Sequence, residues 1–407
     1  MIPSLRKQFN ANFIAEKYQR FLRRIDDACG THVQFRLSET PCFFPGQLLR
    51  RMADDGKVLI RQLVESPEYL ARSNSSIPEE YKVPNEPPHP MFVQVDFGLV
   101  RDPSGELQPK LVELQAFPSL YAYQVAMAES YIDIYGLQDM SASGSRLPAS
   151  ELKYFLSGLS EASYRKLLRT AIVGNHDPEN VILMEIAPEA QKTLPDFLMT
   201  EKMLGVKTVD ITAIKRRGAR LYYERNGRQV PIRRIYNRAI VDELQRKNVK
   251  LGFDWRDDLD VEWAGHPNWY FRISKFSIPY LRHESVPKTR FLDRPERIPD
   301  DLENYALKPL YSFAGLGVVI APTKADIEAI PAENRGDYIL QERLHFEPVI
   351  ETPFGDTKAE VRVMYIWQEK LQAVLTIIRM GRGLMMGVDH NKNMEWVGAS
   401  AGLYLEE

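Results

Sequence analysis

Segments with the pattern of β-strands recur along this chain from residue 91 onward, and helical segments separate many of them. Such an alternation limits the fold to the mixed α/β (α+β) class. Residues 1–80 differ, because their apolar side chains recur at the spacing of amphipathic helices near 4–28 and 46–72. At 407 residues the chain predicts two or three domains, or one large interlocked α/β body.

Charge and cysteine content exclude several classes of protein. The chain has 53 basic and 55 acidic residues, so no overall field attracts nucleic acid or a membrane surface, and neither is a predicted partner. Cys29 and Cys42 are too few for a disulfide framework. The amphipathic first segment does not resemble a signal peptide, and no stretch is apolar enough to span a membrane. We therefore expect a protein of the cytoplasm.

A proline cluster, PNEPPHP (84–90), precedes a hairpin that carries two acidic residues. The cluster forces extended chain into the strand MFVQVDFGLV (91–100), and KLVELQ (110–115) resumes the strand pattern after a turn at DPSG. Asp96 and Glu113 lie on the two strands. Each carboxylate could bind a cation or be a solvated member of a surface ion pair.

The middle of the chain alternates strand and helix. NVILMEI (180–186), a helix near 190–204 and the strands at 206–214 and 230–239 predict a small Rossmann-like unit. Asn237 and Arg238 fall where a strand gives way to a helix, and there they could contact a substrate or cap the helix.

The tail has the features of a phosphate site. In ALKPLYSFAGLGVVIAP, Lys308 ends a strand, and Ser312, Gly315 and Gly317 form a flexible turn. Small residues let backbone N–H groups approach phosphate oxygens, and a lysine adds a compact positive charge. An ordinary hairpin turn would have the same pattern.

Two later strands and the segment after them add polar candidates. DYILQERL (337–344) could pair its backbone with an adenine edge. AEVRVMYIW (359–367) places Glu360 and Arg362 on one side of a strand, and Arg379 follows in TIIRMGRG. Arginine binds carboxylates and phosphates through two donors at once, although most arginines form surface salt bridges.

Taken in order, Lys275, Lys308, Gln341-Glu342 and Arg379 resemble the nucleotide-binding half of ATP-grasp enzymes. The front segment VQVDFGLVRDPSGELQPKLVELQAFPS resembles the metal-binding part of glutathionylspermidine synthase, and more distantly that of eukaryotic glutathione synthetase. This order is that of a circularly permuted ATP-grasp fold. The resemblance covers about residues 91–400.

The resemblance implies four regions. They are a helical N-terminal region (1–90), a hairpin with helices that carries the metal ligands (91–175), a Rossmann-like substrate unit (176–265), and the nucleotide-binding lobes (266–407).

The resemblance also implies residue roles. Mg²⁺ would be held by Asp96, Glu113 and Gln115, where Gln115 stands in place of the family's asparagine. ATP would be bound by Lys275, Lys308, Ser312, Gly315, Gly317, Gln341, Glu342, Arg343 and Leu344. Catalysis would depend on Arg379 and Arg362, and substrate contacts on Asn237, Arg238 and Ser119. Asp389-x-Asn391 also has metal-pair spacing, but a solvated hairpin loop accounts for it more simply.

The expected activity is that of an ATP- and Mg²⁺-dependent carboxylate–amine ligase that forms an amide or peptide bond through an acyl phosphate. Its partners would be a small-molecule or peptide carboxylate and an amine acceptor. An ATP-dependent kinase or phosphotransferase, and a nucleotide-binding scaffold without turnover, are the alternatives. Release of ADP and phosphate only when an amine is present separates the ligase from the phosphotransferase.

Overall fold

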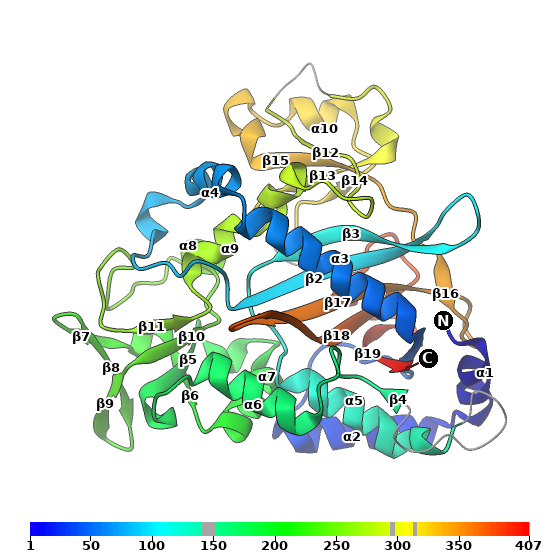
Figure 1. Cartoon of the computed structure of the whole chain (residues 1–407), viewed down its shortest axis with the longest axis horizontal. Helices are drawn as coiled ribbons and strands as arrows, with labels where there is room; N and C mark the ends of the chain where they lie inside the picture. The colour runs from blue at the N-terminus through cyan, green and yellow to red at the C-terminus, as the bar shows by residue number, and fades with distance from the viewer. Residues whose placement is uncertain (141–151, 294–297, 312–315, 407) are drawn as a thin grey trace.

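The largest element of the fold is a sheet of eight strands. The structure is a computed structural model that describes residues 1–140, 152–293, 298–311 and 316–406. Six strands lie side by side in the order β1-β19-β18-β17-β2-β3, with β16 paired to β17 and β4 to β19 (Figure 1). They are β1 (Cys42–Pro45), β2 (Phe92–Arg101), β3 (Leu107–Gln115), β4 (Leu152–Lys153), β16 (Pro348–Ile350), β17 (Thr357–Trp367), β18 (Leu371–Gly381) and β19 (Gly398–Leu405).

The predicted hairpin is present as β2 and β3. The turn between them closes with a hydrogen bond from Gly105 N to Asp102 O at 2.9 Å. Asp102 Oδ1 also accepts hydrogen bonds from the N–H groups of Ser104 and Glu106. The turn residues thus form the backbone reversal that DPSG predicts.

Helices cover both faces of this sheet. Helix α3 (Gly46–Val64) crosses one face, where Val95 and Val363 belong to the same hydrophobic cluster as the apolar residues of α3 (Figure 1). On the other face, Phe92 and Met364 pack with residues of α5 (Tyr123–Tyr135) and α6 (Glu161–Ile172). Because side chains alternate along a strand, each face has its own core.

The first eighty residues are mostly helical, as predicted, but each predicted segment is divided. The first forms α1 (Pro3–Asn12) and α2 (Ala15–Cys29), and the second forms α3 and α4 (Pro67–Ser73). Strand β1 lies between the two segments and was not predicted. Cys29 and Cys42 are both buried free thiols.

The middle of the chain contains a parallel sheet, in agreement with its strand–helix alternation. Its strands have the order β11-β10-β5-β6, and β7, β8 and β9 form a separate antiparallel sheet. The expected strand at 230–239 is two strands that belong to different sheets. The elements are β5 (Val181–Glu185), α7 (Leu194–Leu204), β6 (Lys207–Asp210), β7 (Lys215–Arg217), β8 (Arg220–Arg225), β9 (Arg228–Ile232), β10 (Arg234–Asn237), α8 (Val241–Arg246), β11 (Glu262–Ala264) and α9 (Pro267–Arg272).

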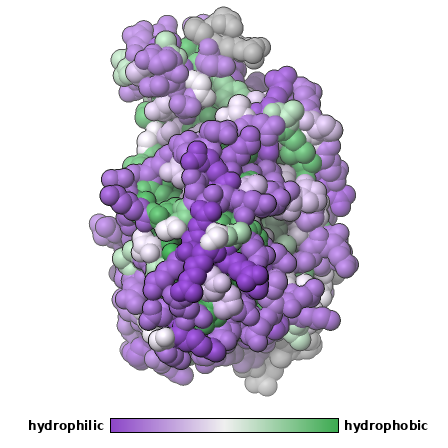
Figure 2. Space-filling model, turned by 90° about the vertical axis from the view of Figure 1, so that its left-hand side faces the viewer, coloured by the Kyte–Doolittle hydropathy of each residue, from purple (hydrophilic) through white to green (hydrophobic). Residues whose placement is uncertain are grey.

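A small lobe projects from the body of the molecule (Figures 1 and 2). It has its own hydrophobic cluster, and its sheet has the order β12-β15-β13-β14. Its elements are β12 (Thr289–Phe291), β13 (Tyr305–Pro309), β14 (Val319–Ile320), α10 (Lys324–Glu328) and β15 (Tyr338–Glu342). Within the described ranges, no helix combines the length and apolar character needed to cross a membrane.

Candidate functional site

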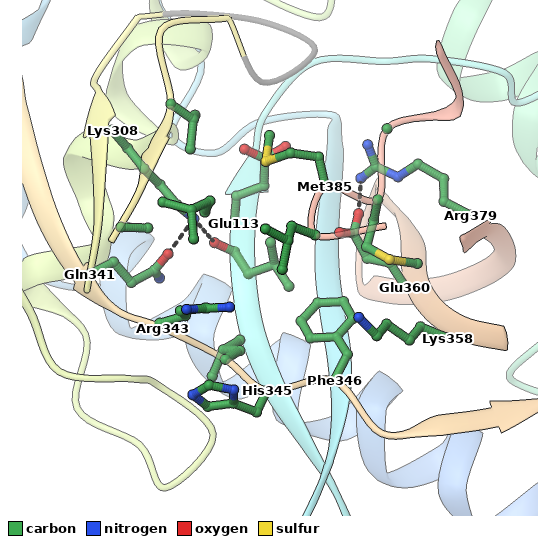
Figure 3. Close-up of a pocket in the computed structure, with 18 of the residues that line it drawn as sticks. Glu113, Lys308, Gln341, Arg343, His345, Phe346, Lys358, Glu360, Arg379 and Met385 are labelled. Atoms are coloured by element: carbon green, nitrogen blue, oxygen red, sulfur yellow. Dashed lines mark hydrogen bonds and ion pairs between the residues drawn. The ribbon is translucent and has the colours of Figure 1, made fainter. Parts of the chain in front are cut away.

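A pocket lies between the lobe and the large sheet. Its cavity volume is about 230 Å³. The lobe side is lined by Ala306, Lys308, Val318, Ile320, Gln341, Glu342, Arg343 and Leu344, and the sheet side by Val112, Glu113, Lys275, Phe346, Lys358, Glu360, Arg379 and the segment 384–387. Figure 3 shows Lys308 and Gln341 at one end, Glu360 and Arg379 at the other, and Glu113 between them.

Strand register brings the charged residues of the sheet side together. Glu113 of β3 is paired with Asp96 of β2, and Asp96 is paired with Arg362 of β17. Glu360 of β17 is paired with Arg379 of β18. Since residues paired across antiparallel strands point to the same face, these five side chains form one cluster.

Two arginines hold Asp96. Arg362 donates from Nε to Asp96 Oδ1 at 2.6 Å and from Nη2 to Oδ2 at 2.7 Å, and Arg379 donates to Oδ2 as well. The Asp96 side chain is 1% exposed. Burial alone would raise the pKa of Asp96, but the two guanidinium groups outweigh it and lower that pKa below its ordinary value. Asp96 therefore stays ionised within the protein.

Glu360 has the opposite shift. It lines the pocket and forms an ion pair with Arg379, yet it is only 5% exposed. Burial raises the pKa of Glu360 to about 7, against the opposing charge of Arg379. The nearby carboxylates Asp96 and Glu113 add to this increase. Glu360 is thus the carboxyl group of the pocket whose charge changes near neutral pH.

Lys308 and Lys275 supply positive charge near Glu113. Lys308 donates to the side chain of Gln341 and to the carbonyl of Val112, the latter at 3.4 Å. Val112 lies at an irregularity in the β2–β3 register, which turns its carbonyl toward the lysine. Lys275 Nζ lies 3.9 Å from Glu113 Oε2. Burial lowers the pKa of Lys308, Lys275 lowers it further, and Glu113 opposes both effects.

The structure places the predicted adenine-binding segment at the lobe end of the pocket. Gln341 is on β15, and Glu342, Arg343 and Leu344 continue from it along the cavity. Gly317 has a φ of +72°, a conformation that favours glycine. Ser312 and Gly315 lie outside the described residues.

Gln115 does not line the pocket. Its Nε2 donates to Gln94 Oε1 at 3.0 Å, and in the reversed orientation its amide oxygen accepts from Arg362 Nη1 at 3.0 Å. Either orientation gives Gln115 a protein partner. Gln94 in turn donates from Nε2 to Ser119 O at 2.8 Å. Ser119 is therefore joined to the charged cluster through its backbone.

Asn237 and Arg238 are buried and do not line the pocket. The charge of Arg238 opposes the increase that burial causes in the pKa of two other buried groups, Asp196 and Glu185. Arg238 is 2% exposed and donates to Pro118 O. Asn237 Oδ1 accepts from the N–H of Ala239 at 3.2 Å in the turn before α8. The N-cap residue of α8 is Ile240 and has no side-chain cap, so the alternative that Asn237 caps the helix was wrong. We call this group of four residues the buried junction.

Comparison with known proteins identifies the architecture. No protein-family model matches the chain, and no curated protein sequence matches it. Among solved structures, it is similar to a glutathione synthetase-like effector, GSS30, from Globodera pallida in its apo form. The sequence identity is 11%, the TM-score is 0.57, and the match covers 97% of this chain and 99% of that one. This chain has a glutathione synthetase-like fold.

Within this fold, the donors for a metal ion are few. Across the parts of the chain that the structure describes, no group of three or more His, Cys, Asp or Glu residues is arranged to hold a metal. Of the predicted ligands, Glu113 lines the pocket with its side chain 25% exposed. Asp96 and Gln115 are occupied by protein partners. Glu113 offers one accessible carboxylate, which lies 3.9 Å from Lys275 Nζ and 3.7 Å from Arg362 Nη2.

Several lining residues of this glutathione synthetase-like fold were not predicted as site residues. They include His345, Phe346, Lys358 and the residues Leu384, Met385 and Met386. The sequence signal is present for the last three, because a run of large apolar residues between glycines is unusual for a solvated loop. The expectation of a solvated loop was wrong for Asn391, which is fully buried.

Proposed function

We propose that this protein is an ATP- and Mg²⁺-dependent carboxylate–amine ligase with a circularly permuted ATP-grasp arrangement. The observation that carries the proposal is the half-buried Lys308 at the lobe end of a pocket between the lobe and the large sheet. The pocket is lined by five lysine or arginine side chains and three glutamates among the described residues, so it has an excess of positive charge. An excess of this sign suits a polyphosphate.

The lobe end of the pocket suits the base of a nucleotide. Val318, Ile320 and Leu344 give it apolar walls, and the segment from Gln341 to Arg343 lines it beside them. Lys308 and Lys275 then lie where phosphate groups extend toward the sheet. Positive charge placed in advance at this position stabilises the charge that develops during phosphoryl transfer.

The sheet end suits the reacting carboxylate. In a ligase of this kind, a carboxylate oxygen attacks the terminal phosphorus of ATP and ADP leaves. The amine then displaces phosphate from the acyl carbon and loses a proton. Arg379, with its side chain 22% exposed, lies at this end and can hold a carboxylate oxygen or an acyl phosphate oxygen.

Glu113 fits a magnesium ligand in this scheme, with the other ligands supplied by phosphate oxygens and water. Mg²⁺ would supply charge neutralisation at the phosphates. Asp96 and Gln115 remain predicted ligands that would first have to leave Arg362, Arg379 and Gln94.

Nucleotide binding by a Lys308→Ala variant tests the proposal. We expect its affinity for Mg-ATP, measured by calorimetry, to fall by about 100-fold, because a half-buried counter-charge to the phosphates is removed. Lys370→Ala, at an exposed lysine in the turn after β17, is the matched control and should keep its affinity. Unchanged affinity in Lys308→Ala, with a normal melting curve, would reject the nucleotide site.

A nucleotide-binding scaffold without turnover is the second candidate. It is favoured by the arginines that hold Asp96 and by the hydrogen bond between Gln115 and Gln94. The similar solved structure is itself described as an effector. Tight Mg-ATP binding without amine-stimulated ADP release over a broad panel of carboxylates and amines would favour this candidate over the ligase.

A further inference from the structure

The loop after β18 is held from within by one buried amide. Asn391 is fully buried, and its Oδ1 accepts hydrogen bonds from the N–H groups of Arg382 and Gly383, each at 3.2 Å. Its Nδ2 donates to the carbonyl of Met385 at 2.9 Å and to that of Gly387 at 3.2 Å. Four hydrogen bonds from one side chain fix the shape of the loop.

Glycines allow the loop to close on this amide. A Cβ atom at Gly381 would lie 2.8 Å from Asn391 Nδ2, and one at Gly387 would lie 2.9 Å from His390 Nδ1. Both distances are too short for a side chain. Glycine and asparagine together therefore make a shaped loop of residues 381–391, which we call the braced loop.

The braced loop presents large apolar side chains to the pocket. Leu384, Met385 and Met386 line the cavity, and Leu384 is 70% exposed. Phe346 lines the same pocket, and its ring lies over Gly98, where a Cβ atom would come within 2.3 Å of it. Figure 3 shows Met385, Phe346 and Lys358 grouped at the sheet end. Apolar side chains held open to solvent beside a cavity are typical of a binding surface.

Positive charge lies beside these apolar side chains. Arg379 lines the same end of the pocket, and Lys358 donates from Nζ to Gly383 O at 3.3 Å, against the braced loop. A ligand that fits both features carries an anion and an apolar chain.

We infer that the carboxylate substrate is amphiphilic, with its carboxylate facing Arg379 and an aliphatic chain packed on Leu384, Met385 and Phe346. This inference rests on the proposed ligase function, whose carboxylate it specifies. A short polar carboxylate would leave Leu384 in water. A longer chain would cover it, and each methylene that becomes buried there increases the affinity about fourfold.

A chain-length series tests the inference. Acetate, butanoate, hexanoate and octanoate are titrated into the full chain by calorimetry, with and without Mg-ADP. We expect octanoate to bind at least about tenfold more tightly than acetate, since several methylenes reach the apolar wall. Leu384→Ser should weaken octanoate binding by about fivefold and leave acetate binding unchanged, because acetate is too short to reach residue 384.

Phe354→Ser is the matched control, because Phe354 is 55% exposed but does not line the pocket. Equal affinities for acetate and octanoate would overturn the inference. An equal loss of octanoate affinity in Phe354→Ser and Leu384→Ser would overturn it too. Met385→Ser provides a second variant, with the same expected direction, should Leu384→Ser fail to fold.

The two proposals can fail separately. If octanoate affinity depends on chain length and Leu384 while Mg-ATP does not bind, the apolar subsite stands and the ligase function fails. If Mg-ATP binds and depends on Lys308 while chain length has no effect, the nucleotide site stands and the amphiphilic substrate is rejected.

Discussion

The pocket and the buried junction contain the same kinds of side chain in different surroundings. In the pocket, Arg379 faces Asp96 and Glu360, and its side chain is 22% exposed. In the junction, Arg238 is 2% exposed, and its guanidinium carbon lies 5.3 Å from the ring centres of both Phe117 and Phe197. An arginine beside carboxylates is therefore a candidate for binding only where a cavity gives a ligand access.

Backbone N–H groups satisfy the carboxylate of the junction, whereas Arg238 Nε is buried without a hydrogen-bond partner among the described residues. Asp196 accepts hydrogen bonds from the N–H groups of Leu120, Ala122 and Tyr123, each at 3.0 Å. Burial raises the pKa of Asp196, and Arg238 opposes the increase. The junction thus fastens the segment after β3 to the parallel sheet, whereas the pocket keeps its carboxylates and lysines beside open space.

The largest effect that separates the two regions is expected from Arg238→Ala. The variant loses the hydrogen bond to Pro118 O, the contacts with the rings of Phe117 and Phe197, and the charge that opposes the effect of burial on Asp196. The free energy of unfolding should therefore fall by about 3 kcal/mol. Urea denaturation measures the change. Arg233→Ala is the control, since Arg233 forms an exposed pair with Asp260 and should contribute less than about 1 kcal/mol.

Nucleotide affinity of the folded Arg238→Ala protein should stay within about twofold of wild type, because the residue does not line the pocket. Normal stability combined with lost Mg-ATP binding would move Arg238 into the functional site and erase the distinction between the two regions.

A smaller effect is expected from Glu113→Gln. The Mg²⁺ concentration that gives half of the maximal ATP affinity should rise about tenfold, a change of about 1.4 kcal/mol, because one charged ligand is lost. Titrating Mg²⁺ at fixed ATP measures it. Glu347→Gln, at a carboxylate in an ion pair with Arg101 that does not line the pocket, should have no effect.

Asp96→Asn sharpens the same test. If Asp96 acts mainly as the counter-charge of Arg362 and Arg379, this variant should lose thermal stability, whereas Glu113→Gln should not. If Asp96→Asn instead kept normal stability and needed as much additional Mg²⁺ as Glu113→Gln, the result would support the predicted role of Asp96 as a ligand.

The smallest effect concerns pH. Glu360 has a folded pKa of about 7 and Glu185 one of about 8, both raised by burial from 4.5. Between 4.5 and the raised value the folded state binds more protons than the unfolded chain, so the free energy of unfolding falls as pH rises. The Glu360→Gln variant should lack the decrease in the free energy of unfolding that Glu360 causes up to about pH 7. The Glu185→Gln variant should lack the decrease that Glu185 causes up to about pH 8.

Calorimetric melting temperatures from about pH 5 to 9 measure these windows. Mg-ATP should alter the difference in melting temperature between wild type and Glu360→Gln, because Glu360 lines the pocket. It should leave the difference between wild type and Glu185→Gln unchanged. The same response to Mg-ATP at both positions would contradict the separation of pocket and junction.

Local patterns in the sequence predicted much of the fold. The alternation in 91–100 and 110–115, with DPSG between them, predicted the hairpin that carries Asp96 and Glu113. The parallel unit also followed from its strand–helix alternation. These features depend on side-chain periodicity and turn residues, which a single segment contains.

The remaining features depend on contacts between distant segments. Nothing near Asp96 in the sequence indicates that Arg362 and Arg379 hold it, and nothing near Asn391 indicates that its amide is buried under the braced loop. The short strand β1 and the small-residue strand β19 are recognisable only once they are paired with each other. In these cases the structure depends on tertiary contacts, which the local sequence pattern does not contain.

The parallel pairing of β1 with β19 affects how the protein can fold during synthesis. Cys42 is paired with Gly402, so hundreds of residues must be translated before this register can form. At about 5–20 residues per second, the ribosome needs on the order of tens of seconds for that stretch. Through this interval, β1 lacks the strand with which it later pairs and is open to misassembly or to a chaperone.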